Sequence, residues 1–198
     1  MAKDGDGKLS VRVGNGPVDV AAVHDLRRRV FVGEFGFSGR MVTTPTDHED
    51  SHVTAWVGGR TVGCLTLSET TANPRLAQTY HLPADGDGRS FRFTKLAVVP
   101  EWRRSRLTGL LMAAGQCRVV DLARPLFTWL VVYGCQYRHI PLYEKLGFRL
   151  HGSAVDAVGP CRVLLRMDGS PAIQHVLDTK RPLAAALLAR CNGTGVES

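Results

Sequence analysis

The segment that most constrains the fold is residues 91–112, in which an apolar strand runs through a proline turn into a helix. The strand is predicted over residues 91–99, and Pro100 marks the turn that follows. From Leu107 onward, apolar residues recur at the spacing of one helix face. Because the turn also carries three arginines, it brings cations and free backbone N–H groups to a helix N-terminus, which favours binding of a phosphate.

The composition favours a single folded domain. The chain has 198 residues, 44% of them hydrophobic, which is enough for one core of ordinary size. No apolar run reaches the roughly 18–20 residues that span a bilayer, and the N-terminus lacks the apolar centre of a signal peptide. Five scattered cysteines form no disulfide or metal-ligand pattern, so we expect a cytoplasmic protein without a bound metal.

The net charge of +7 and the excess of arginine over lysine, 20 to 5, point to an anionic partner. The candidates are a nucleic acid, a phosphorylated cofactor and an acidic carrier protein. The basic clusters at residues 27–29 and 103–106 are not interleaved with aromatic side chains, and no DNA-binding motif is present. We therefore expect no nucleic-acid binding.

Periodicity and turn residues predict strands and helices in mixed order along one domain of residues 1–198. A loose tail at 1–9 and a helical extension at about 170–192 are expected at its ends. The other predicted elements are a strand at 9–13, a helix from Pro17 to about Glu34, a hairpin of 53–57 and 61–67 around Gly58 and Gly59, a long connection at 68–90, strands at 126–134, 148–153 and 162–167, and a short helix at 139–145 ended by Gly147. This order predicts an α/β protein with a single mixed sheet and helices on its faces.

Two segments, LAVVPEWRRSRLTGLLM and PLYEKLGFRL, resemble the GNAT superfamily of acyltransferases. The first is similar to the superfamily's strand, pyrophosphate loop and helix. The second contains its Tyr-x-x-Leu-Gly-Phe signature, which begins here at Tyr143. The resemblance implies a mostly antiparallel mixed sheet, splayed between the fourth and fifth strands, with helices on both faces.

Two further segments narrow the resemblance to one branch of that superfamily. LRRRVFVGEFGF contains Arg27 and Phe31, and DHEDSH contains Asp47 and Asp50. Both are similar to segments of acyl-homoserine-lactone synthases and N-acyl amino acid synthases, which take fatty acyl groups from acyl carrier protein. The resemblance implies that Arg27, Phe31, Asp47 and Lys95 contribute to substrate binding.

The resemblance also implies how the donor binds. The pantetheine arm of an acyl carrier protein or of an acyl-CoA would enter the splay and pair with backbone around Leu96, Ala97 and Val98. Its phosphate would lie at the turn, whose candidate residues are Arg103, Arg104, Arg106, Leu107, Thr108 and Gly109. Where the family usually has glycine, Arg106 either restricts the approach of phosphate or adds a cation to a single phosphate. An arginine-rich rim suits an acidic carrier protein.

Three strand positions depart from the branch. Arg92 and Lys95 replace its usual Glu and Arg, and Thr66 replaces a second Arg. Arg92 cannot accept a proton at neutral pH, so it does not supply the general base. The remaining candidates are Asp47, His48, Glu49, Asp50, His52 and His139, of which we select Asp50 and His139. The acidic segment has two other interpretations, an ammonium-binding loop that leaves proton removal to water and a solvated turn.

Other side chains carry two interpretations each. Tyr143 is the predicted general acid for the leaving thiolate, and its alternative role is packing beside the signature's leucine and phenylalanine. His139 is either catalytic or structural. Arg27 either covers the cleft or forms a salt bridge with Asp25 or Glu34, and Phe31 serves the core, the acyl site or both. A covalent acyl-enzyme on Cys135 is a minor hypothesis, since a cysteine at a strand end usually packs as a small apolar residue.

The sequence therefore predicts an N-acyltransferase that moves an acyl group, fatty rather than acetyl, to a primary amine by direct attack. The acceptor is an amino acid, a peptide or another small amine. The alternatives are an acetyl-CoA-dependent N-acetyltransferase and a non-catalytic domain that binds an acyl thioester or carrier protein. The oligomeric state and the role of the C-terminal segment stay open.

Overall fold

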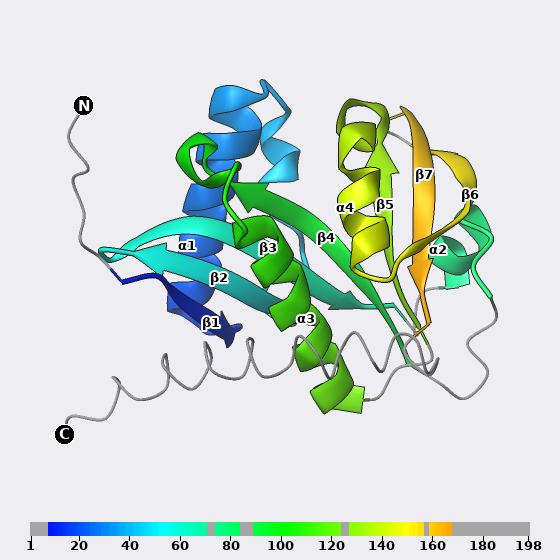
Figure 1. Ribbon diagram of the computed structural model, residues 1–198, viewed down its shortest axis with the longest axis horizontal. Helices are drawn as coiled ribbons and strands as arrows, with labels where there is room; N and C mark the ends of the chain where they lie inside the picture. Colours follow the sequence, from blue (N-terminus) through cyan, green and yellow to red (C-terminus); the bar gives the residue numbers. More distant parts are fainter. Residues whose placement is uncertain (1–7, 71–73, 84–88, 124–126, 157–158, 168–198) are drawn as a thin grey trace.

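The computed structural model describes residues 8–70, 74–83, 89–123, 127–156 and 159–167. These residues form one seven-stranded sheet in the order β1-β2-β3-β4-β5-β7-β6 (Figure 1). Neighbouring strands are antiparallel except for the parallel pair β4 and β5. The predicted mixed and mostly antiparallel sheet is confirmed. The expected helix at 171–191 and residues 1–7 of the expected tail lie outside the described residues.

The strands and helices have the following bounds. The strands are β1 (Ser10–Gly14), β2 (Ser51–Val57), β3 (Arg60–Glu69), β4 (Ser90–Val98), β5 (Phe127–Tyr133), β6 (Arg149–Asp156) and β7 (Gly159–Arg166). The α-helices are α1 (Pro17–Arg27), α2 (Pro74–Thr79), α3 (Leu107–Ala123) and α4 (Ile140–Lys145). A π-helix, η1 (Arg28–Glu34), continues α1, and short 3-10 helices are η2 (Gly39–Met41), η3 (Pro100–Trp102) and η4 (Gly134–His139).

Local sequence signals account for most of these elements. The β2–β3 hairpin turns at Gly58 and Gly59, whose φ angles of 55° and 76° need the freedom of glycine. Gly147 closes the α4 turn at φ 92°. Two features differ from expectation: helix α2 lies within the predicted long connection, and the first helix changes to π geometry after Arg27.

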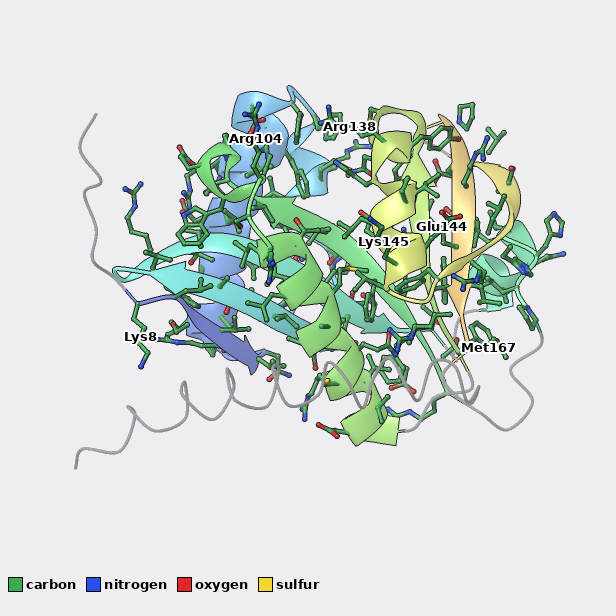
Figure 2. All side chains as sticks on the ribbon, in the orientation of Figure 1. Lys8, Arg104, Arg138, Glu144, Lys145 and Met167 are labelled. Atoms are coloured by element: carbon green, nitrogen blue, oxygen red, sulfur yellow. The ribbon has the colours of Figure 1, made fainter. Side chains whose placement is uncertain are left out.

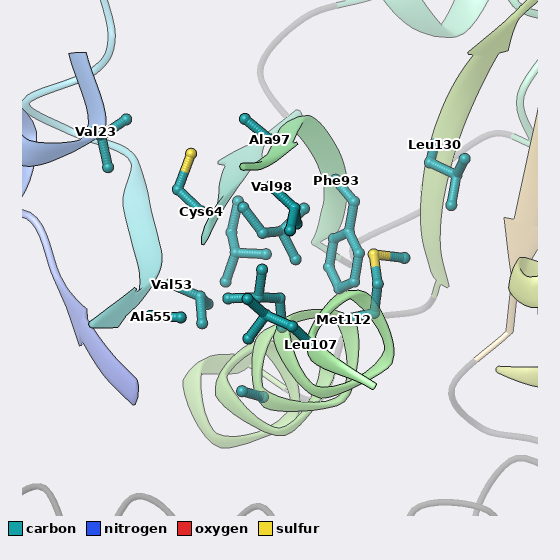
Figure 3. Packing of buried hydrophobic residues seen from close by; sticks show 14 of the residues in the cluster. Val23, Val53, Ala55, Cys64, Phe93, Ala97, Val98, Leu107, Met112 and Leu130 are labelled. Carbon is teal, nitrogen blue, oxygen red and sulfur yellow. The ribbon is translucent and has the colours of Figure 1, made fainter. Parts of the chain in front are cut away.

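Helices cover both faces of the sheet. In Figure 1, α3 and α4 lie in front of the sheet and α1 lies behind it. Helix α3 approaches closely because Gly115 faces β3, and a Cβ there would come within 2.9 Å of Leu65 Cδ2. Figure 3 shows Leu107 and Met112 of α3 packed toward Phe93 of β4 in the resulting core.

Strands β4 and β5 diverge in the middle of the sheet. They pair only from Ser90 with Phe127 to Phe93 with Leu130, although both strands continue. Beyond Phe93, the side of β4 that faces β5 has no partner strand. The predicted splay is therefore confirmed, and it interrupts the sheet between the halves that α3 and α4 cover (Figure 1).

A bulge in β4 accompanies the divergence. Thr66 of β3 pairs with Thr94 and Cys64 pairs with Ala97, so β4 has one extra residue between them. Lys95 lies in this bulge with a φ of 51°, in the left-handed region that side chains other than glycine rarely adopt. Such backbone strain is concentrated at functional sites, which directs attention to this part of β4.

Candidate active site

The free edge of β4 presents backbone groups toward β5. Val99 N–H donates to Val62 O of β3 at 3.0 Å. Because successive residues of a strand point their peptide groups to opposite sides, the N–H and C=O of Val98 point away from β3. Val98 O accepts a hydrogen bond from Arg103 Nε at 2.9 Å. An extended arm lying between β4 and β5 would find strand-like partners here.

The N-terminus of α3 lies directly after this edge. Ser105 Oγ accepts a hydrogen bond from Leu107 N–H at 3.1 Å and donates one to Trp102 O at 2.6 Å, which fixes the turn. The next N–H groups, of Thr108 and Gly109, belong to the first helical turn and have no carbonyl partner within the helix. A Cβ on Gly109 would meet no atom within 4 Å, so the approach to this turn is open.

The three arginines of the turn are not equivalent. Arg103 forms a two-pronged ion pair with Glu34 of η1 and lies 5.1 Å from the centre of the Phe35 ring. Arg104 and Arg106 are exposed and have no partner among the described residues. Figure 2 shows Arg104 at the same end of the molecule as Arg138, which follows β5. Both sides of the splay thus carry cations at one end.

Tyr143 projects from α4 into the core. Only 6% of its surface is exposed, and burial raises its pKa to about 12. Phe148 N–H donates to Tyr143 O at 3.1 Å, so the signature turn holds the residue in place. Its hydroxyl has no hydrogen-bond partner in the part of the chain that the structure describes. A protonated and unpartnered hydroxyl on a largely buried side chain can donate a proton or a hydrogen bond to a ligand.

His139 ends η4, close to the mouth of the splay. Its side chain is largely exposed. Partial burial, followed by the charges of Arg138 and Arg103, lowers its pKa. The influence of Arg103 shows that η4 lies across from the arginine turn, so His139 belongs to the same end as the candidate phosphate site.

Behind β3 and β4, Arg27 and Asp47 form a buried ion pair. Their side chains are 0% and 1% exposed. Arg27 Nη1 donates to Asp47 Oδ1 at 2.9 Å and to Val42 O at 2.9 Å, and Nη2 donates to Thr66 Oγ1. Burial raises the pKa of Asp47, but hydrogen bonds from Arg27 and from Thr44 N–H outweigh it and hold the pKa well below its usual range. The pair is ionised and committed to internal contacts.

His52 continues this network. Its Nε2 lies 2.8 Å from Asp47 O, and because a carbonyl only accepts, Nε2 carries the proton. The Nδ1 atom, 2.9 Å from Thr66 Oγ1, then accepts the hydroxyl proton. Burial lowers the pKa of His52, which agrees with a neutral ring. Both ring nitrogens are therefore occupied.

Asp50 lies beside this network but accepts fewer hydrogen bonds than Asp47 does. It is 7% exposed and accepts a hydrogen bond from Thr46 Oγ1 at 2.9 Å. Burial raises its pKa, in contrast to that of Asp47. A carboxylate with a raised pKa is a better proton acceptor than an ion-paired one.

Lys95 reaches the same group of charges from the bulge in β4. Its Nζ is buried and has no hydrogen-bond partner among the residues that the structure describes. Burial, and then the charge of Arg27, lowers its pKa to about 8. Asp47, Asp50 and Cys64 also act on the Lys95 charge, so the lysine faces the network from the β4 side.

The predicted site residues thus fall into two groups on either side of β4. The candidate donor residues follow the free edge and the α3 turn, with Tyr143 and His139 nearby. The candidate acceptor residues gather behind β4, except that Phe31 lies in the core, 4% exposed, against Phe37. Cys135 is an exposed free thiol. Among the described residues, no three possible metal-binding side chains come together, and none of the helices is long and apolar enough to cross a membrane.

Sequence reasoning missed three contributors. His24 Nε2 lies 2.8 Å from Asp47 Oδ2, and its position three residues before Arg27 on α1 could have indicated a shared face. In the sequence, Thr66 was noted only because it replaces an arginine of the family, yet its hydroxyl links Arg27 to His52. Glu34 was considered as a partner of Arg27 and instead pairs with Arg103.

Comparison with known proteins identifies the fold. The chain is similar to FeeM, an N-acyl amino acid synthase from uncultured soil microbes, at 10% identity over 85% of this chain and 98% of the other, with a TM-score of 0.64. It is similar to BjaI, a CoA-dependent acyl-homoserine lactone synthase solved with SAM and isopentyl-CoA, at 18% identity over 93% and 99% of the chains, with a TM-score of 0.64. An acyl-CoA N-acyltransferase from Pseudomonas aeruginosa matches at 17% identity over 80% and 99%, with a TM-score of 0.63.

These likenesses are structural. No protein-family model and no curated protein matches the sequence. The shared architecture, with its parallel β4–β5 pair in an otherwise antiparallel sheet, is the GNAT fold that the sequence predicted.

Proposed function

We propose that this chain, which has the GNAT fold, is an N-acyltransferase that moves an acyl group from a thioester to a primary amine. One observation carries the proposal: β4 has no partner strand on its β5 side where the two strands diverge, and an open helix N-terminus follows directly, with two arginines that have no partner among the described residues. The first feature suits an extended pantetheine arm, and the second suits its phosphate.

The donor proposed here is a fatty acyl thioester on an acyl carrier protein or on CoA. Arg104 and Arg106 are exposed beside the α3 N-terminus, where a phosphate and an acidic carrier helix would both find cations. Val98 N–H points into the splay, a suitable place to hold the oxyanion that forms during attack on the thioester. The similarity to FeeM and BjaI adds support for this branch.

Tyr143 is the proposed general acid. Its raised pKa keeps the hydroxyl protonated at neutral pH, so it can deliver a proton to the departing thiolate. Tyr143→Phe removes the proton and leaves the ring in place. We expect turnover to fall at least about 10-fold, with little change in stability, since the hydroxyl has no internal partner. An unchanged rate would make Tyr143 a packing residue.

The function is tested by incubating the purified protein with octanoyl and acetyl thioesters and a mixture of amino acids, peptides and small amines, while released thiol is measured. Each acyl group is offered on an acyl carrier protein and on CoA. Preferred release from octanoyl carrier protein supports the full proposal. Equal or better use of acetyl-CoA replaces it with an N-acetyltransferase, and no release with any pair leaves a non-catalytic binding domain.

A further inference from the structure

We propose that Lys95 is the general base that removes a proton from the ammonium group of the acceptor. The proposal rests on the proposed acyltransferase function and deepens it. It assigns a chemical step to a residue that the sequence suggested only for substrate binding, on a strand where Arg92 occupies the position of the expected carboxylate.

Lys95 lies where β4 diverges from β5. It lies two residues beyond Phe93, the last β4 residue that pairs with β5. The bulge and the φ of 51° turn its side chain into the group of charges behind the strand. A glycine would adopt this backbone without strain, whereas Lys95 holds it at a cost.

The amino group of Lys95 is buried and isolated from hydrogen-bond partners among the described residues. A buried ammonium has three protons to share and is costly when none is shared. A neutral amine costs much less, and it offers one lone pair to an incoming proton.

The surrounding charges favour the neutral form. Arg27 faces Lys95 from α1, Asp47 and Asp50 face it from the segment before β2, and Cys64 faces it from β3. Burial and Arg27 outweigh the two carboxylates and bring the pKa to about 8, so about a tenth of the molecules carry a neutral Lys95 at pH 7. That fraction suffices for general-base catalysis near neutral pH.

The neighbouring groups are less suitable as bases. Asp47 is held in its ion pair with Arg27, and both nitrogens of His52 are engaged. Asp50 accepts a hydrogen bond from Thr46 and competes with Lys95 as the base, so the experiment must separate the two.

The proposed reaction releases one proton for each amide that forms. Neutral Lys95 takes one proton from the acceptor ammonium, and the freed nitrogen lone pair attacks the thioester carbon. The C–N bond forms and the C–S bond breaks. Tyr143 delivers its proton to the thiolate, and the second proton lost by nitrogen returns to Tyr143. Lys95 then releases its proton to water. The products are an amide, a thiol and one proton.

Three variants test the proposal. Lys95→Met removes the base, and Lys95→Arg keeps the positive charge but cannot lose its proton. Lys8→Met is the matched control, because Lys8 is exposed and lies outside the site (Figure 2). At pH 7 we expect both Lys95 variants to lose about 10²- to 10⁴-fold in turnover and the control to be unchanged. Full activity of Lys95→Arg would overturn the proposal and assign Lys95 to charge recognition.

An acceptor that is already neutral at pH 7, such as trifluoroethylamine, separates the base from other roles. Since its first deprotonation is unnecessary, the defect of Lys95→Met should shrink at least about 10-fold relative to an alkylamine. An equal defect with both acceptors contradicts the proposal. Asp50→Asn should lose less activity than Lys95→Met, and the reverse order assigns the proton to Asp50.

The pKa of Lys95 can also be measured directly, without a turnover assay. NMR of the lysine side chains should show one resonance with a midpoint near pH 8 that disappears in Lys95→Met and persists in Lys8→Met. A Lys95 midpoint above 10 rejects the base even in an active enzyme. A midpoint near 8 without any thiol release rejects the acyltransferase function instead.

Discussion

Arg27 and Lys95 are two buried cations on the same side of the sheet, and their surroundings differ. Arg27 donates to Asp47, Val42 and Thr66 and is fully buried. Lys95 has a buried Nζ with no hydrogen bond, on a strained backbone. The Arg27 charge connects α1, the loop before β2 and strand β3, whereas the Lys95 charge makes no such connection. A buried amino group without an internal partner is a better candidate for chemistry than a guanidinium whose two Nη atoms are held by a carboxylate, a carbonyl and a hydroxyl.

The largest effect expected from this comparison is on stability at Arg27. Arg27→Met leaves Asp47 buried without its cation, so we expect a loss of about 3–5 kcal/mol in the free energy of unfolding. Chemical denaturation at pH 7 measures it. The matched control is Arg28→Met, since Arg28 is the exposed neighbour and should change stability by less than about 0.5 kcal/mol. Similar losses of stability for both variants would show that the ion pair of Arg27 and Asp47 does not stabilise the fold.

Lys95→Met should have the opposite sign. We expect it to raise the free energy of unfolding at pH 7 by roughly 2 kcal/mol, because one pKa unit corresponds to about 1.4 kcal/mol and partial contact with solvent reduces the full difference. A gain in stability together with a loss of turnover is the pattern of a functional residue. A destabilised Lys95→Met protein would place Lys95 with Arg27 as a structural cation.

The pH dependence sharpens the same prediction. The folded pKa of Lys95 lies near 8, below its usual value of 10.5. Between these two values the unfolded chain keeps the lysine proton while the folded protein releases it, so stability due to this group rises with pH across that window. We expect the denaturation midpoint of the wild type, taken relative to that of Lys95→Met, to rise from pH 7 to pH 10. A difference that does not change with pH would exclude the shifted pKa of Lys95.

The smallest effect is expected at the exposed pair of Arg103 and Glu34. Both side chains remain about 30% exposed, and hydrogen bonding to Arg103 lowers the pKa of Glu34. Glu34→Gln should cost less than about 1 kcal/mol, as exposed ion pairs usually do. Thermal unfolding checks this value. A loss as large as that of Arg27→Met would mean that η1 depends on this pair.

Elements with strong local signals were predictable. The two glycines of the β2–β3 hairpin and the strand, turn and helix from β4 to α3 lie close to the expected positions, because turn chemistry and periodicity act over a few residues. Helix α2 was missed because it is one and a half turns long and lies in a polar stretch with little periodicity. The π geometry of η1 has no comparable sequence signal.

The candidate site divides in the same way. The sequence placed Arg103, Tyr143 and the acidic segment by motif, and it identified Arg92 and Lys95 as departures. It left open whether Arg27 would contact a ligand or a carboxylate. The structure shows that Arg27 pairs with Asp47, twenty residues away in the sequence, because α1 and the segment before β2 meet behind β3.

The sequence by itself determined the order of the strands, the arginine turn at the start of α3 and the missing carboxylate at position 92. These follow from residue types and short spacings, which act locally. Only the tertiary structure decided that β4 bulges at Lys95, that its amino group is buried without a partner among the described residues, and that Arg27 pairs with Asp47. Each of these depends on strand register and on contacts between distant segments, which local propensities do not specify.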